Sequence, residues 1–493
     1  MRVDNYQPIV DLCRESGAAK ALYYIARIQN RKELAVHINN GKTEEVTTGN
    51  LEGIGIQVFN AAGLMGFAAT DRLTPENTRT LFDKAALMIE KGASYLDEPS
   101  LEFQKLTPLQ KRIEIQMDHP QDQISPAAIE ERLTVLNKEI AGIDPRLSVR
   151  TVLRIVDEEW RICRADGTDV LFNTPRAFIF HSITAKDAAD TAAAYANISG
   201  KDLEILLLAS SNERLQRRAR KAADLALQLL TAPKIPSGKY KLVIDYALAK
   251  GLAHEAFGHA AETDNLESSI LGENGRLKSG LQVASSKLSI IDGPLAGDYA
   301  YQPISAVGME RQTVTIVDHG TLIGGLADIF SAARAGVAPT GAERVESIFH
   351  LPIARMSNIR IEMEDAIPLE REFEAITPAE LYRVLREHQL VKAEEKVLYL
   401  SGFQGGQVNP AFGDFVFHCS GIYELSENPR LFKPAIFSGK VLSVLQAVRA
   451  AIGSSQLDAM GTCGKMGQGV PSCGGSHYFL VIEQNPEILI GGE

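Results

Sequence analysis

The stretch His254-Glu255-Ala256-Phe257-Gly258-His259 carries the strongest signal in this chain of 493 residues. A His-Glu pair followed by a second histidine one helical turn later is a way to present two imidazoles and a carboxylate to one metal ion. The common metal-binding pattern places its histidines four residues apart, whereas here they are five apart. The motif therefore needs a helix that departs from regular geometry.

The spacing leaves two interpretations open. On a regular α-helix, positions i and i+4 lie about 40° apart around the axis, while i and i+5 lie about 140° apart. Side chains so far apart cannot bind one tetrahedral ion, so either there is no metal site or the helix is distorted. Gly258 favours a distortion because glycine tolerates unusual dihedrals and a π-bulge inserts one residue into a turn. We expect a motif helix from Tyr246 to Ala261 that is irregular between His254 and His259.

The composition is that of a globular protein with more than one domain. The hydrophobic content is 45% and the charged content is 23%, and 493 residues are too many for one core. A net charge of -11 argues against a nucleic-acid partner, which needs a basic surface. The five cysteines are few, odd in number and scattered, which fits a reducing compartment better than a disulfide framework.

Targeting and membrane signals are also missing from the sequence. The N-terminal residues Met1-Arg2-Val3-Asp4-Asn5 have an early acidic residue and lead into no apolar h-region. No apolar run approaches the length of a membrane span. We therefore expect a cytoplasmic protein with no membrane partner.

The order of predicted elements indicates an α+β fold in three segments. We expect an N-terminal α+β subdomain over residues 1–95, a middle α+β subdomain and linker over 96–236, and a β-rich C-terminal domain over 237–493 that carries the motif helix. The clearest linker is Ala232-Pro233-Lys234-Ile235-Pro236-Ser237-Gly238. The patterns also predict a short helix from Ile9 to Ser16 that Gly17 ends, and one long amphipathic helix from Lys201 to Leu230.

A metal held by two histidines needs at least a third protein ligand. Glu262 and Asp264 follow closely, and they are ligands, partners that orient an imidazole, or the solvated end of the helix. A second candidate is Cys463, in the glycine-rich segment 461–471. This segment is not a phosphate-binding loop because its Gly-Lys lacks the required spacing. Its many glycines indicate tight folding around Cys463 or the close approach of another chain.

Taken together, these residues resemble the TldD/PmbA family of metallopeptidases. The resemblance spans nearly the whole chain and rests on four stretches: Glu33 to Val36 with Gly53 to Ile56, His254 to Asp264, Pro339 to Asn358, and Gly461 to Pro471. The helix and the glycine-rich loop are its most specific parts. The family is known for a His-Glu-x-x-x-His helix whose third zinc ligand is a loop cysteine.

The resemblance implies a zinc site made by His254, His259 and Cys463, with Glu255 as the catalytic base. Three protein ligands leave a fourth position for a water molecule, and Glu255 can take its proton. The family implies hydrolysis of short or unfolded peptides bound as extended strands inside a dimeric chamber. The partner is a second copy of the chain or a motif-free TldE/PmbA-like subunit.

Two departures from the family pattern put the substrate preference in doubt. The end of the loop, 472–477, is unusually polar and contains Cys473 and His477, which we expect to be packing residues rather than ligands. The segment 302–308 lacks the acidic residues expected there. These departures do not affect the expected metal site. Two other functions remain open: a pathway-specific hydrolase of one small peptide-like metabolite in natural-product biosynthesis, and a non-catalytic binding subunit.

Overall fold

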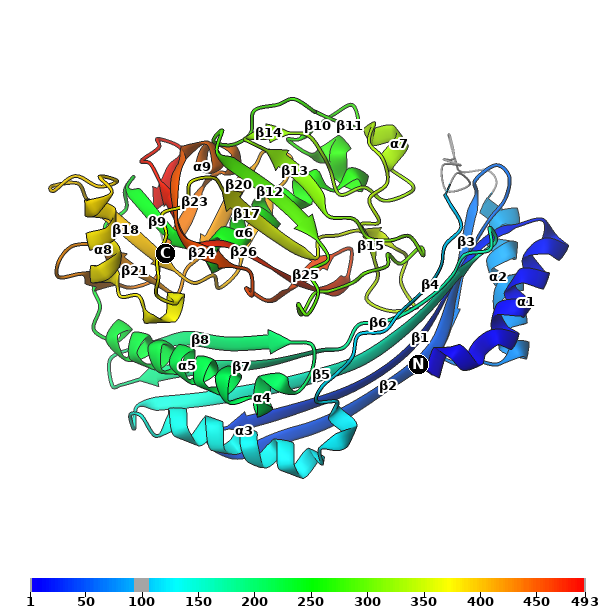
Figure 1. Cartoon of the computed structure of the whole chain (residues 1–493), viewed down its shortest axis with the longest axis horizontal. Coiled ribbons are helices and arrows are strands. Elements are labelled where there is room, and N and C mark those ends of the chain that lie inside the picture. Colours follow the sequence, from blue (N-terminus) through cyan, green and yellow to red (C-terminus); the bar gives the residue numbers. More distant parts are fainter. Residues whose placement is uncertain (1, 93–105, 492–493) are drawn as a thin grey trace.

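The computed structural model describes residues 2–92 and 106–491 (Figure 1). The N-terminal half forms a long curved sheet with helices packed against it, and the C-terminal half forms a β-rich body over the concave side of that sheet. The expected α+β fold with a β-rich C-terminal half is confirmed. Within the described ranges, no helix has both the length and the apolar character that crossing a membrane requires.

The N-terminal sheet has eight strands in the order β3-β2-β1-β5-β6-β4, with β7 beside β5 and β8 beside β7. The strands are β1 (Tyr23–Asn39), β2 (Lys42–Phe59), β3 (Met65–Thr70), β4 (Gln110–Ile113), β5 (Leu147–Arg164), β6 (Asp169–Asn173), β7 (Arg176–Lys186) and β8 (Thr191–Gly200). Strand β1 is central and pairs along its length with β2 and for most of it with β5. Regular antiparallel pairing over such lengths makes a stiff wall for the body above it.

The sheet includes strands from both of the predicted N-terminal segments. Strands β1 to β3 come from the first segment and β4 to β8 from the second. The predicted boundary between residues 95 and 96 lies outside the described residues. The boundary at residue 236 stays a prediction.

The helices of this half cover the other side of the sheet and one of its edges (Figure 1). They are α1 (Gln7–Lys20), α2 (Pro75–Gly92), α3 (Pro126–Ala141), α4 (Glu204–Leu207) and α5 (Ala209–Leu229). The predicted helix end at Gly17 is wrong, because α1 continues through it and ends where Ala21 adopts a left-handed conformation. The predicted single helix from Lys201 to Leu230 is also wrong, since Leu208 is extended and separates α4 from α5.

The C-terminal half is built on an eleven-stranded sheet in the order β14-β13-β12-β17-β26-β9-β18-β21-β22, with β24 and β25 also paired to β26. Its strands are β9 (Lys241–Asp245), β12 (Leu288–Gly293), β13 (Val314–Asp318), β14 (Thr321–Leu322), β17 (Asn358–Met363), β18 (Val397–Ser401), β21 (Gly421–Glu424), β22 (Arg430–Phe432), β24 (Val448–Gln456), β25 (Gly461–Lys465) and β26 (Gln468–Ile482). A four-stranded sheet contains β19 (Gly406–Asn409), β20 (Asp414–His418), β23 (Ile436–Lys440) and β27 (Ile488–Ile490).

Short elements complete this half. The paired two-residue strands are β10 (Gly272–Glu273) with β11 (Arg276–Leu277), and β15 (Glu343–Arg344) with β16 (Ile353–Ala354). The α-helices are α6 (Tyr246–Gly251), α7 (Ala332–Ala335), α8 (Pro378–Glu387) and α9 (Val441–Ala447). Its largest apolar core surrounds the motif helix, and a second apolar cluster includes α8 and the neighbouring strands.

An apolar cluster joins the two halves. Trp160 and Phe172 of the curved sheet pack in one cluster with Ile304, Val307 and Ile348 of the C-terminal half. Buried apolar contact of this kind holds two layers in a defined position because each loses exposed hydrocarbon surface. The curved sheet therefore forms a fixed wall next to the loops of the C-terminal half.

Candidate metal centre

The motif helix starts from a fully buried strand. Strand β9 runs between β18 and β26 and ends at Asp245, whose carboxylate accepts hydrogen bonds from the backbone N–H groups of Ala247 and Leu248. This is an N-cap, which satisfies two amides that the first helical turn leaves free. The same carboxylate accepts from the backbone N–H of Gly402. The helix therefore begins at a fixed point in the sheet.

The helix changes its winding at the two histidines. Helix α6 ends at Gly251, a π-helical segment covers Leu252–Gly258, and a 3₁₀ turn follows over His259–Ala261. The backbone N–H of His259 donates to the carbonyl of His254, five residues earlier. A π turn thus brings position i+5 to the place that i+4 holds in an α-helix. The expected irregularity between the histidines is confirmed, and their ring centroids lie 5.2 Å apart.

Gly258 has a different role from the one expected. Its φ of -58° and ψ of -47° are ordinary helical values, so the distortion does not depend on unusual glycine dihedrals. A Cβ atom at this position would lie 2.1 Å from the sulfur of Met356 and 2.9 Å from the carbonyl oxygen of Ala253. Gly258 is needed because the neighbouring loop approaches the helix closely.

Cys463 comes from a hairpin far away in the sequence. Strands β25 and β26 pair with Cys463 opposite Val470, and Met466 and Gly467 form the two-residue turn with positive φ values. Such a turn matches the twist of the strands that it joins. The hairpin lays Cys463 against the π segment, and only 1% of the cysteine is exposed.

Three candidate ligand atoms meet at this point. One atom each of His254, His259 and Cys463 lies within 4.8 Å of the other two. Among residues 2–92 and 106–491, these three side chains are the group identified as able to hold a metal ion. The sulfur of Cys463 is 3.6 Å from Nε2 of His259. Bond lengths of about 2.05 Å to nitrogen and 2.3 Å to sulfur in a tetrahedral zinc site predict a separation of about 3.6 Å. The donor set and the separation of this pair fit zinc.

The state of His254 also fits a ligand. Both its ring nitrogens are buried and have no hydrogen-bond partner among the described residues. Burying a polar group without a hydrogen-bond partner costs free energy of folding, and a bound cation would remove that cost. Burial lowers the pKa of His254 well below its usual range, and the charge of Lys250 adds to the effect. His254 is therefore neutral, as a metal ligand must be.

Glu255 lies beside this group but is more open. Its carboxylate oxygens are 4.0 Å from Nε2 of His254 and 3.9 Å from Nε2 of His259. Its side chain is 28% exposed, the most of the four predicted site residues. The carboxylate can therefore reach a water molecule or a substrate atom at the open side of the group.

Glu262 supports His259 from behind. Its carboxylate is fully buried and lies 2.9 Å from Nδ1 of His259, on the ring nitrogen that does not face Cys463. Burial by itself would lower the pKa of His259, but Glu262 and Cys463 outweigh it and raise that pKa to about 10. Of the three roles open to Glu262, the structure selects the partner that orients an imidazole. Asp264 instead pairs with Lys465, whose Nζ is 2.7 Å away.

Arg355 is a residue of the site that sequence reasoning missed. It is completely buried, and its Nε lies 3.4 Å from the sulfur of Cys463. It also donates to the carbonyl oxygens of Cys463 and Gln468, on the two strands of the hairpin. Burial raises the pKa of Cys463, whereas His259 and Arg355 lower it, and the net effect is a lowered pKa. No sequence pattern links two residues 108 positions apart.

Cys473 and His477 lie elsewhere. Cys473 is fully buried and belongs to a small cluster with Tyr299 and Ala300. The ring of His477 bonds the backbone N–H of Met363 and the carbonyl of Gly453 within the sheet. Cys473 therefore packs in the core and His477 is half-buried, both within β26 rather than in a loop, and neither joins the candidate ligand group.

Two family models match this chain. The model described as "PmbA/TldA metallopeptidase C-terminal domain" matches residues 237–473, and the model described as "PmbA/TldA metallopeptidase domain 1" matches residues 24–90. Together they cover more than half of the sequence, including both histidines and Cys463.

Similar proteins agree with this match. A metalloprotease of Methanothermobacter thermautotrophicus is 26% identical over 462 residues, which cover 93% of this chain and 94% of that protein. A zinc metalloprotease TldD homolog of Saccharolobus solfataricus is 26% identical over 260 residues, 52% of each chain. The crystal structure of TldE from Thermococcus kodakarensis has the same fold, with a TM-score of 0.76, 15% identity, and coverage of 98% of this chain and 100% of that one. This chain therefore belongs to the TldD/PmbA family and is a metallopeptidase, a hydrolase that acts on peptides.

Proposed function

We propose that the chain is a zinc-dependent peptidase in which His254, His259 and Cys463 hold the metal and Glu255 is the catalytic base. The observation that carries the proposal is that two nitrogen atoms and one sulfur atom, on elements more than 200 residues apart, lie within 4.8 Å of one another, with the Cys463–His259 pair at zinc spacing. The printed name of the Saccharolobus relative supports the choice of zinc.

The role of Glu255 follows from its position. A zinc ion bound here supplies a Lewis acid that lowers the pKa of water and polarises the scissile carbonyl. Glu255 is close to both histidines yet partly open, so its carboxylate can accept a proton from an attacking water and pass it to the leaving amine. Glu262 holds the His259 ring in one orientation during this exchange.

The substrate we propose is a short or unfolded peptide bound as an extended strand. Strand β25 carries Cys463 and, within the described part of the chain, pairs with β26 alone. Its other edge offers free backbone donors and acceptors, to which an extended peptide can add as a further strand. A peptide on this edge would run past the candidate ligands.

The assembly we propose is a dimer that encloses the metal centre, in the cytoplasm. The fold shared with TldE supports a partner of the same architecture, either a second copy or a motif-free TldE/PmbA-like subunit. The five cysteines are all free and buried, which suits a reducing compartment. Peptide cleavage by the purified chain alone would show that a second copy of the chain is a sufficient partner for activity, without a motif-free subunit.

Metal analysis of two cysteine variants tests the site. We expect about one equivalent of zinc in the wild-type protein and in Cys473→Ala, and a loss of most of it in Cys463→Ala. Cys473 is the matched control because it is equally buried and lies in the paired strand β26. Full zinc occupancy in Cys463→Ala, or less than about a tenth of an equivalent in the wild type, would contradict the proposal.

A further inference from the structure

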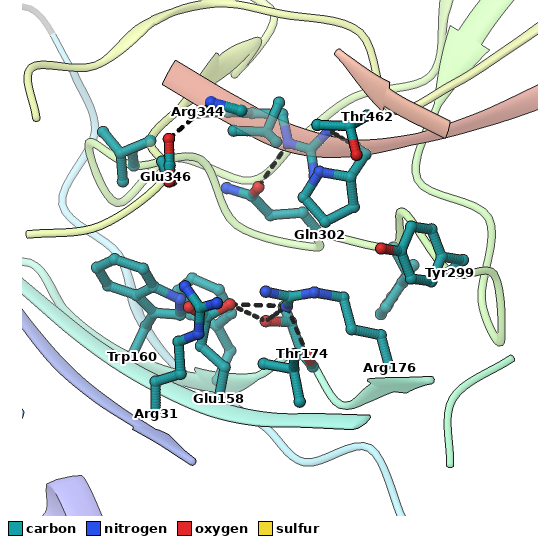
Figure 2. Close-up of a pocket in the computed structure, with 18 of the residues that line it drawn as sticks. Arg31, Glu158, Trp160, Thr174, Arg176, Tyr299, Gln302, Arg344, Glu346 and Thr462 are labelled. Atoms are coloured by element: carbon teal, nitrogen blue, oxygen red, sulfur yellow. Dashed lines mark hydrogen bonds and ion pairs between the residues drawn. The ribbon is translucent and has the colours of Figure 1, made fainter. Parts of the chain in front are cut away.

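A second site with strong chemical character lies between the two halves of the molecule. It is a cavity of about 170 Å³ whose walls face each other across a gap (Figure 2). We call it the arginine cavity, after four lining residues: Arg31, Arg154, Arg176 and Arg344. The first three come from the curved sheet, and Arg344 comes from the C-terminal half. The metal chemistry proposed above uses none of them.

Arg344 is a buried cation, only 3% exposed, with no direct ion-pair partner among the described residues. It donates instead to the side-chain oxygen of Gln302 at 2.8 Å and to the carbonyl oxygens of Met356 and Pro471. The nearby Arg311 is equally buried but pairs with Asp292 at 2.8 Å. Carbonyl groups compensate a buried guanidinium only in part, so Arg344 favours an anion.

The opposite wall does not supply that anion. Arg31 and Arg154 share one carboxylate, Glu33, at 2.5 Å from each. Arg176 pairs with Glu158 at 2.7 Å. Glu158 also accepts hydrogen bonds from Gln29 and Thr174, so most of its lone pairs are already used. Glu33 and Glu158 are therefore already paired with arginines of their own wall.

The cavity has an excess of positive charge. Four guanidinium groups face the carboxylates of Glu33, Glu158 and Glu346, and Glu346 accepts a hydrogen bond from the backbone N–H of Gly469. This positive region is unusual for a chain with a net charge of -11. Tyr299 adds a hydroxyl that makes no hydrogen bond to another described residue and points into the cavity (Figure 2). A guanidinium and a hydroxyl together match the oxygens of a carboxylate.

The size of the cavity limits what it can hold. Drug-sized ligands need about 300–1,000 Å³, whereas a cavity of about 150 Å³ holds a molecule as small as benzene. At 170 Å³, the arginine cavity fits a single small group rather than a nucleotide or a folded segment. A carboxylate with its carbon stem is of this size.

The cavity and the candidate metal centre share the β25–β26 hairpin. Thr462 and Pro471 face each other in the hairpin and line the cavity, and the next pair along is Cys463 with Val470. Successive residues of a strand point to opposite faces, so a peptide added to the edge of β25 presents alternate side chains to the metal centre and to the cavity. The two sites can therefore bind neighbouring parts of one peptide.

We propose that the arginine cavity binds a carboxylate of the peptide substrate, with Arg344 as its main charge partner. The inference rests on the proposed peptidase function and adds a preference for acidic substrates. The carboxylate is either the C-terminus of the peptide or an aspartate or glutamate side chain near the scissile bond. Both sources present the same two oxygens, so experiment must distinguish them.

Four matched peptides provide the test. They share one sequence and differ only in Glu or Gln near the cleavage site and in a C-terminal acid or amide. We expect the wild type to favour one of the acidic forms by about tenfold or more in kcat/KM, mainly through KM, because a hydrogen bond to a charged group is at stake. The pair that shows the preference identifies the source of the carboxylate.

Arginine variants then assign the preference to the cavity. Arg344→Gln should reduce it to about onefold, and Arg176→Gln should weaken or reverse it because Glu158 loses its partner. Arg176 also keeps the test decisive if Arg344→Gln does not fold. Arg150→Gln is the control, because Arg150 lies on β5, pairs with Glu44 and does not line the cavity. It should behave as wild type.

The outcomes separate this inference from the peptidase proposal. Cleavage of all four peptides at equal rates, or a preference that survives in both arginine variants, would overturn the carboxylate site and leave the peptidase proposal intact. No cleavage by the wild type would count against the peptidase proposal instead. In that case calorimetry can still measure how tightly the same four peptides bind. Equal affinities for all four would contradict the proposed carboxylate site.

Discussion

Two buried histidines, one in each half of the molecule, show how the halves differ. His181 on β7 of the curved sheet is 1% exposed, and its Nδ1 lies 2.8 Å from the hydroxyl of Thr151. Burial lowers the pKa of His181 to about 4. His259 in the candidate metal centre is also largely buried, but Glu262 and Cys463 raise its pKa to about 10. Burial alone makes a neutral packing residue, whereas a carboxylate and a thiol beside the ring prepare it for proton or metal binding.

The surrounding structure differs in the same way. The curved sheet is made of long strands with regular pairing, and its central strand β1 is continuous over 17 residues. The candidate metal centre is made of short elements: a six-residue helix, a π segment, a 3₁₀ turn and a tight hairpin. Regular structure satisfies the backbone locally, while the irregular elements depend on contacts such as those of Arg355 and Glu262.

The largest expected effect is on catalysis in the metal centre. Glu255→Gln removes the proton acceptor but keeps its shape, and we expect kcat for peptide cleavage to fall by about 10²–10⁴-fold. Zinc content should not change, because Glu255 is outside the group of three candidate ligands. Steady-state kinetics with parallel metal analysis measure both. A variant that keeps more than about a tenth of wild-type kcat would show that Glu255 is not the base.

The second effect belongs to the curved sheet. The folded-state pKa of His181 is depressed to about 4, below the value of about 6.5 in an unfolded chain. The unfolded state therefore binds a proton first as the pH falls, and stability is lost between about pH 6.5 and 4, by about 3 kcal/mol at pH 4. Denaturant melts of His181→Gln should show a flatter pH dependence in this window. Identical pH profiles for the variant and the wild type would show that His181 does not cause the loss of stability in this window.

The third effect is on metal affinity through Glu262. Glu262→Gln leaves the fold in place but weakens the hydrogen bond that orients His259, and we expect zinc affinity to fall by about 10–100-fold. Competition with a chelator measures this change. The His181→Gln protein is a suitable control, since it alters a buried histidine in the other half. An unchanged affinity in Glu262→Gln would mean that Glu262 serves only to balance Lys465.

Local patterns in the sequence predicted much of the fold and of the candidate site. The order of predicted elements indicated an α+β fold with a β-rich C-terminal half, and the five-residue spacing predicted a distorted helix, which is present as the π segment. Two helix limits were predicted incorrectly. Gly17 lies within α1 because it packs against Tyr24 rather than ending the helix, and Leu208 interrupts the segment predicted as one long helix. At Gly17 the close contact with Tyr24 shows tertiary packing outweighing local propensity, whereas Leu208 is 40% exposed and its extended conformation has no packing explanation.

The sequence by itself determined the types of candidate site residue and their local order: two histidines, a glutamate between them and a glycine-rich loop around one cysteine. These are properties of neighbouring residues, which spacing and side-chain chemistry express directly. Only the tertiary structure decided that Gly258 is needed for space, that Arg355 contacts Cys463, and that Arg344 is a buried cation facing a cavity. The reason is that burial and charge balance depend on residues far apart in the chain, which only the folded sheets bring together.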